Sequence, residues 1–132
     1  MYYASLISMA EGLKYGCTTI FEQQYIYPEG NRDHLIDSQF KATKDIGIRY
    51  HSGRSCMTMT EKDGGLPPDV LGETAAEVID DLERIVKTYH QEEYLGMQRV
   101  VAAPCSPFSV AEETYRDIVL FAREKGIHIH RI

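Results

Sequence analysis

The sequence predicts an α/β fold in which amphipathic helices alternate with short strands. Apolar residues recur at helical spacing in four segments, and a short run rich in β-branched or apolar residues follows each segment. Strands that are joined through helices run parallel, with right-handed crossovers. Four such units amount to half of a (β/α)8 barrel, yet they also approach the size of a small doubly wound sheet. Periodicity alone does not choose between these two architectures.

The first two units account for the N-terminal part of the chain. A helix is expected over 4–16, because its last residue is a glycine that suits a left-handed C-cap. The first strand, 17–25 (CTTIFEQQY), is rich in β-branched and aromatic residues. Turn residues separate it from a second helix, which Asp33 caps and Gly47 ends. The second strand is expected over 48–52 (IRYHS).

A long loop and the most regular helix come next. Residues 58–72 contain a Gly-Gly and a Pro-Pro pair, which predict a connection on the surface. Thr74 and Glu77 have the spacing of a capping box, and apolar residues then occupy one face of a helix up to Tyr89.

The last unit repeats the pattern. The third strand is expected over 99–103 (RVVAA), and a second capping box of Ser109 and Glu112 predicts a helix that Gly126 ends. A final strand is expected over 127–132 (IHIHRI).

Composition predicts one globular domain over residues 1–132 and excludes several partners. The chain is 43% hydrophobic and 26% charged, and its net charge of -6 gives no support for a nucleic-acid surface. No apolar run approaches the ~20 residues that span a bilayer. The three cysteines form no C-x-x-C motif, which indicates a reducing cytoplasm rather than a disulfide framework.

Polar side chains at the expected strand ends are the candidates for ligand binding, because parallel α/β folds bind ligands there. These residues are Gln23 and Gln24 after the first strand, Arg54 after the second, and Cys105 and Ser106 after the third. Each also has a structural interpretation. The amides can simply mark a strand end, the arginine can pair on the surface, and the thiol can be packed and inert.

Two histidines near the end of the chain are candidate metal ligands. His128 and His130 share one face of the expected strand, because side chains alternate along a strand. A metal centre needs three or four ligands, and only His51 could approach the same edge. The chain by itself is therefore not expected to assemble a zinc site.

Two long motifs are GRSCMTMTEKDGGLPPD at 53–69 and VVAAPCSPFSV at 100–110. They resemble one branch of the amidohydrolase superfamily, which contains 8-oxoguanine deaminases and hydroxydechloroatrazine ethylaminohydrolases. The resemblance includes GCTTIFEQQYIYP at 16–28 and the terminal IHIH, so it extends over nearly the whole chain.

The resemblance implies a metal-dependent (β/α)8 barrel to which this chain supplies strands two to five, an incomplete barrel. It implies zinc or iron in the complete enzyme and makes His130 the strand-five metal ligand. The family's proton-shuttling Glu falls beyond Ile132, so no catalytic residue is expected in this chain. By position, the substrate contacts that the resemblance implies would be Gln23 or Gln24, Arg54, and the pair of Cys105 and Ser106.

The implied activity is hydrolytic removal of an amine from a small heterocyclic substrate, a purine or triazine ring such as 8-oxoguanine. We expect the isolated chain to lack activity and to bind metal poorly. The alternative is a non-catalytic α/β module that binds a ligand or another chain. Half a barrel would leave its inner face open, so we expect a homo-oligomer. Otherwise, one helix would move to the open face and give a doubly wound sheet.

Overall fold

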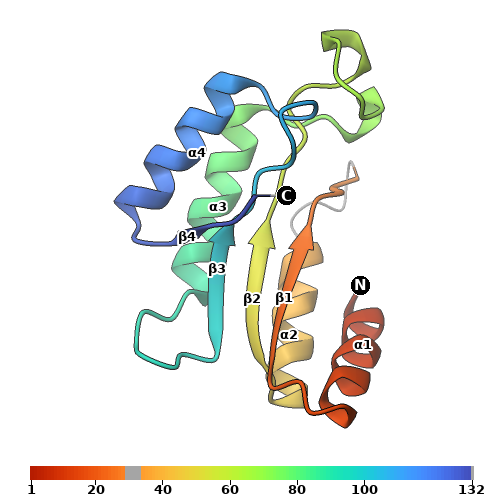
Figure 1. Cartoon of the computed structure of the whole chain (residues 1–132), viewed down its shortest axis with the longest axis vertical. Helices are drawn as coiled ribbons and strands as arrows, with labels where there is room; N and C mark the ends of the chain where they lie inside the picture. Colours follow the sequence, from red (N-terminus) through yellow and green to blue (C-terminus); the bar gives the residue numbers. More distant parts are fainter. Residues whose placement is uncertain (29–33, 132) are drawn as a thin grey trace.

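A computed structural model describes residues 1–28 and 34–131 (Figure 1). The described residues contain a four-stranded parallel sheet in the order β1-β2-β3-β4. Consecutive strands are neighbours, as in a segment of a (β/α)8 barrel. The elements in chain order are α1 (Tyr2–Lys14), β1 (Thr19–Gln24), α2 (Leu35–Ile46), β2 (Arg49–Arg54), α3 (Ala75–Tyr89), β3 (Gln98–Ala102), α4 (Glu112–Glu124) and β4 (His128–Ile129).

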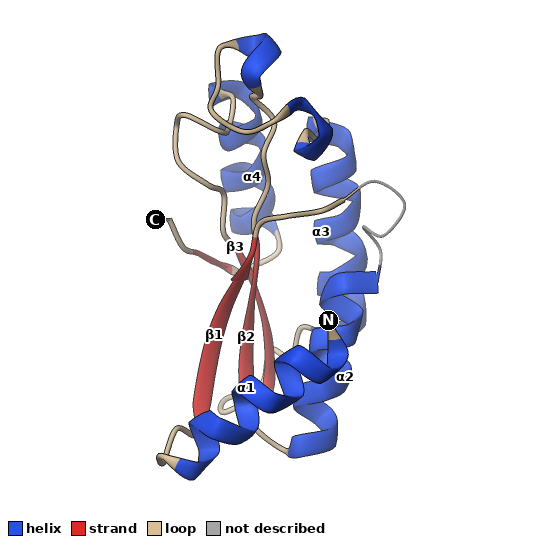
Figure 2. Cartoon of the chain, turned by 90° about the vertical axis from the view of Figure 1, so that its right-hand side faces the viewer, coloured by secondary structure: helices blue, strands red, loops and turns tan. Residues whose placement is uncertain are grey.

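One hydrophobic core joins the sheet to α2, α3 and α4. Figure 2 shows α2 and α3 on the same side of the strands, and α4 packs against α3, β3 and β4. Buried residues of all three helices, including Phe40, Leu82 and Ile118, belong to a single cluster. The doubly wound alternative is therefore not observed, and the helices cover one face as they do in a barrel.

Strand alternation separates a core face from an open inner face. On the core face, the Tyr50 ring meets Phe40 edge-on at 5.4 Å between ring centroids, and Phe40 stacks on Tyr89 at 4.2 Å. The neighbours of Tyr50 in β2 point the other way. We call this opposite side the inner face. It carries residues of all four strands and Ala103, which directly follows β3: Phe21, Gln23, His51, Gly53, Arg99, Val101, Ala103 and His128.

The helix ends match the sequence prediction at one capping box and not at the other. Thr74 and Glu77 form the expected reciprocal bonds at the start of α3. The predicted box of Ser109 and Glu112 is wrong, because α4 begins at Glu112 with Ala111 as its N-cap. Ser109 instead belongs to a loop, where its carbonyl accepts bonds from two amides of the preceding long loop. The predicted cap Asp33 lies outside the described residues.

Several predicted strand limits shift by a few residues. β1 begins at Thr19, because Gly16 adopts φ 83° and the Cys17 amide still bonds to the carbonyl of Gly12 in α1. β2 extends to Arg54, whereas β4 contains only His128–Ile129. The predicted last strand, 127–132, is therefore too long, and its final residue, Ile132, lies outside the described residues.

The long loop between β2 and α3 lies beyond the carboxyl ends of the strands (Figure 1). It contains 3-10 turns at Glu61–Asp63 and Asp69–Leu71. The Leu66 amide donates to the Phe108 carbonyl at 3.1 Å, which ties this loop to the β3–α4 connection. Among the described residues, no helix has the length and apolarity needed to cross a membrane.

Candidate functional site

Three neighbouring strands place a hydrogen-bonded cluster at the carboxyl end of the inner face. The Gln23 Nε2 atom donates to the Ala103 carbonyl at 3.0 Å and to Ser55 Oγ at 3.3 Å. Ser55 Oγ is also hydrogen-bonded to Cys105 Sγ at 3.0 Å. Two predicted binding residues, Gln23 and Cys105, are therefore brought together. Ser55, which sequence reasoning missed, joins them.

The Gln23 side chain leaves one hydrogen-bonding atom for a further partner. Its amide nitrogen is held by Ala103 and Ser55, which fixes the orientation of the amide. Its Oε1 atom is buried and has no hydrogen-bond partner among the described residues. A buried acceptor without a donor costs about 1–3 kcal/mol, so an N–H or O–H group brought against it would be stabilised.

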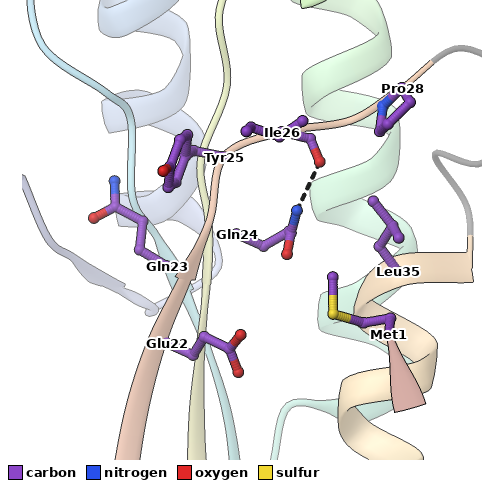
Figure 3. A pocket seen from close by; sticks show the side chains of 8 residues that line it. All are labelled: Met1, Glu22, Gln23, Gln24, Tyr25, Ile26, Pro28 and Leu35. Atoms are coloured by element: carbon purple, nitrogen blue, oxygen red, sulfur yellow. Dashed lines mark hydrogen bonds between the residues drawn. The ribbon is translucent and has the colours of Figure 1, made fainter. Parts of the chain in front are cut away.

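Gln24 lies on the other face of β1 (Figure 3). Its Nε2 atom donates to the Ile26 carbonyl at 2.6 Å, and its Oε1 atom accepts from Gln39 at 3.2 Å. Of the two amides that strand position alone left open, Gln23 therefore joins the inner-face cluster and Gln24 does not.

A pocket of about 380 Å³ adjoins Gln24 on this core side, and Glu22 is among its lining residues (Figure 3). Burial raises the pKa of the Glu22 carboxyl, although hydrogen bonds from Tyr50 and Gln39 act in the opposite direction. Glu22 lies on the core face of β1, whereas Gln23, which also lines this pocket, directs its amide to the inner-face cluster.

Arg54 occupies a buried ion-pair network rather than the inner face. Its guanidinium bonds to both carboxylate oxygens of Glu73, at 2.7 and 3.1 Å, and to Asp81 at 2.9 Å. It also donates to the Ser55 carbonyl at 2.6 Å and lies 4.1 Å from the Tyr27 ring centroid. The side chain is 1% exposed, so it does not form a surface ion pair. It reaches the Gln23 cluster through the backbone carbonyl of Ser55, on the core side of the strand end.

Ser106 marks the turn after β3. Its carbonyl accepts from the amides of Ser109 at 2.9 Å and Val110 at 3.1 Å. The residue is half-buried, next to Cys105 in the chain. Its structural contribution is thus to shape the β3–α4 connection.

The predicted metal ligand His130 lies just beyond β4. Its amide donates to the Ala102 carbonyl at 2.9 Å, and its ring lies 4.6 Å from the Phe21 ring centroid. His51 is beside Arg99 in the register of β2 and β3, further from the carboxyl end of the strands. Burial lowers the pKa of His51, and the nearby Arg99, His128 and Arg49 lower it further.

The described residues do not form a complete metal centre. Among them there is no group of three or more His, Cys, Asp or Glu side chains placed to hold a metal ion. His130 can therefore offer one nitrogen to a metal, whereas the remaining ligands are not assembled by this part of the chain.

Two curated proteins are similar in sequence along almost the entire chain. Hydroxydechloroatrazine ethylaminohydrolase of Pseudomonas sp. (strain ADP) is 38% identical over 98% of this chain and 27% of its own length. 8-Oxoguanine deaminase of Pseudomonas aeruginosa is 35% identical over 96% of this chain and 28% of its own length. The chain thus spans about a quarter of the curated relatives that it matches. No family model matches the chain.

Solved structures resemble the fold over the same extent. An atrazine chlorohydrolase from Arthrobacter aurescens, described as complexed with zinc, is 28% identical with a TM-score of 0.93. It matches 96% of this chain and 28% of its own chain. An amidohydrolase from a Sargasso Sea environmental sample gives a TM-score of 0.86 at 28% identity, over 97% of this chain and 31% of its own. The four-stranded sheet is therefore a partial (β/α)8 barrel.

The cysteine environments predict selective alkylation. Cys56 is fully buried, and burial raises the pKa of its thiol to about 12, whereas Cys17 and Cys105 are partly exposed. Because the thiolate is the reactive form, iodoacetamide at pH 8 should label Cys17 and Cys105 in the folded chain but spare Cys56 until urea is added. Peptide mass spectrometry would locate the labels.

A Cys56→Ala variant provides the matched control, since its folded form should take up as much label as the unchanged chain. Labelling of Cys56 as fast as Cys105 under native conditions would contradict the placement of these two thiols.

Proposed function

The chain is homologous to one segment of the amidohydrolase-superfamily aminohydrolases, and on this premise we propose that it forms part of a metal-dependent hydrolytic deaminase. The proposed substrate is an amino-substituted purine or triazine ring, such as 8-oxoguanine. The names of both relatives support this chemical class. We further propose that the isolated chain is inactive and that the protein works in the cytoplasm, where its free cysteines stay reduced.

The observation that carries this proposal is the cluster of Gln23, Ser55 and Cys105. It lies on the inner face at the carboxyl ends of three strands, which is where (β/α)8 enzymes bind their substrates. The unpaired Gln23 Oε1 atom suits a ring N–H, and the Ser55 hydroxyl can donate or accept as the ring requires. This arrangement can recognise and orient a planar heterocycle.

The contribution of the chain to a metal site is limited to His130 in this proposal. The zinc in the atrazine chlorohydrolase structure supports zinc as the metal of the complete enzyme. The described residues do not fit a metal ion by themselves, because they form no cluster of three ligands. We therefore propose that the chain binds a metal ion weakly or not at all.

The second candidate function is a non-catalytic module that binds a ligand or another chain through the same face. The incomplete ligand set among the described residues favours it. The two functions differ in what they require, since a deaminase needs additional ligands from outside this segment, whereas a binding module needs none.

Ligand binding and turnover test the proposed function together. Titration with 8-oxoguanine should shift the NMR signals of the Gln23 side-chain amide and of the Ser55 and Cys105 amides. Ser55→Ala should weaken that binding, because the alanine cannot hold the Gln23 amide. No ammonia should be released from 8-oxoguanine, guanine or a hydroxytriazine, with or without added zinc.

Thr88→Ala is the matched control, because this exposed hydroxyl on α3 is remote from the cluster and bonds to its own helix. Shifts at Glu22 and Gln24 without shifts at Ser55 or Cys105 would contradict the proposed binding site. Ammonia release in proportion to the chain concentration would contradict the proposed inactivity.

We also propose that two copies of the chain associate through the inner face. The helices lie on the other side of the sheet, and Phe21 on the inner face is 40% exposed. Within the described residues β1 pairs only with β2, and β4 only with β3, so both sheet edges are open. At about 25 cal/mol per Å² of apolar surface, covering a few hundred Å² would contribute several kcal/mol.

Sedimentation velocity at micromolar concentrations tests this association. The chain should sediment as a dimer, and Phe21→Glu should shift it towards the monomer by placing a charge in the interface. Leu120→Glu is the control, because Leu120 is 57% exposed on α4 and should leave the dimer intact. A stable monomer for the unchanged chain across this range would exclude the proposed assembly.

A further inference from the structure

Phe21 and His130 meet across the whole width of the sheet. Phe21 belongs to β1 and His130 follows β4, yet their ring centroids are 4.6 Å apart with an interplanar angle of 56°. Two further strands lie between them. Adjacent strands are ~4.8 Å apart, so a flat sheet would separate β1 from β4 by ~14 Å. The contact therefore requires a sheet that curls towards its inner face.

Gly53 provides the space for the Phe21 ring. A Cβ atom at position 53 would lie 2.7 Å from Phe21 Cζ and 3.0 Å from Phe21 Cε2, closer than carbon atoms approach. It would also lie 3.1 Å from the Ala103 Cβ atom. Phe21 is paired with His51, two residues before Gly53, so its ring leans along the sheet towards the carboxyl ends of the strands.

The His130 imidazole depends on such a contact for a defined position. The residue is exposed and lies beyond the last ladder pair of β4, and its amide bond to Ala102 fixes only the backbone. An exposed side chain samples several rotamers, and a favourable ring contact selects the rotamer that preserves it.

We propose that Phe21 is a positioning residue for His130 and that Gly53 makes room for it, because the missing Cβ at this position admits the phenyl ring. The phenyl ring holds the imidazole over the inner face, at the same end of the strands as the Gln23 cluster. This inference rests on the proposed function for the role of His130, but the geometry that it concerns can be measured without turnover or metal.

NMR spectroscopy of the full chain tests the proposal directly. The unchanged protein should give nuclear Overhauser effects between the Phe21 and His130 ring protons, together with a ring-current displacement of the His130 signals. His130→Gln identifies those signals. Phe21→Leu should abolish the displacement, whereas Phe21→Tyr, which keeps the ring, should retain it.

Gly53→Ala supplies a second, independent variant, because its methyl group should displace the Phe21 ring and change the His130 signals with the phenylalanine still present. Phe108→Leu, at an exposed loop position, is the control and should leave those signals unchanged. Far-UV circular dichroism verifies that each variant folds.

The proposal is overturned if the unchanged chain lacks the ring-to-ring effects, or if the folded Phe21→Leu variant keeps the His130 signals. Failure of 8-oxoguanine to bind would reject the proposed function and leave this contact in place. If the contact between Phe21 and His130 is absent while 8-oxoguanine still binds at Gln23, only the positioning role is rejected.

Discussion

The arrangement of the strand ends depends on the ion pairs of the buried Arg54 guanidinium. It joins the end of β2 to Glu73 before α3, to Asp81 within α3 and to the Tyr27 ring after β1. Asp81 also pairs with Arg84, which reaches Asp37 in α2. Removing one partner from a buried ion pair costs about 3–5 kcal/mol, because the other charge stays in the interior without compensation.

This network and the inner-face cluster are two sides of the same strand end. Arg54 and Ser55 are consecutive, and their side chains serve opposite faces. The guanidinium holds the Ser55 carbonyl, while the Ser55 hydroxyl meets Gln23 and Cys105. A fixed strand end on the core side thus orients the polar groups on the inner side. We infer that the ion pairs stabilise the proposed binding surface without touching a ligand.

Local patterns were enough to predict the parallel α/β order, because hydrophobic spacing and turn residues act within a few positions. Long-range partners were not predictable in the same way. Glu73 lies 19 residues after Arg54, and nothing nearby in the chain indicates a buried pair. Strand alternation places Gln23 and Gln24 on opposite faces, but only the packing of α2 decides which face is the core. Ser55 could have been found, because strand alternation places it on the same face as Gly53, two positions earlier. The contact of Phe21 with His130 depends on sheet curvature, which sequence spacing does not encode.

Native-state hydrogen exchange of an Arg54→Lys variant tests whether the buried guanidinium fixes the strand ends. Lysine keeps the charge but loses the planar fork that binds Glu73 and Asp81 together. The amides of Ser55 and Ala103, which bond to the Gln24 and Arg54 carbonyls, should lose protection by about tenfold or more relative to amides within α1. Equal protection of these two amides in the variant and the unchanged chain would contradict this role of Arg54.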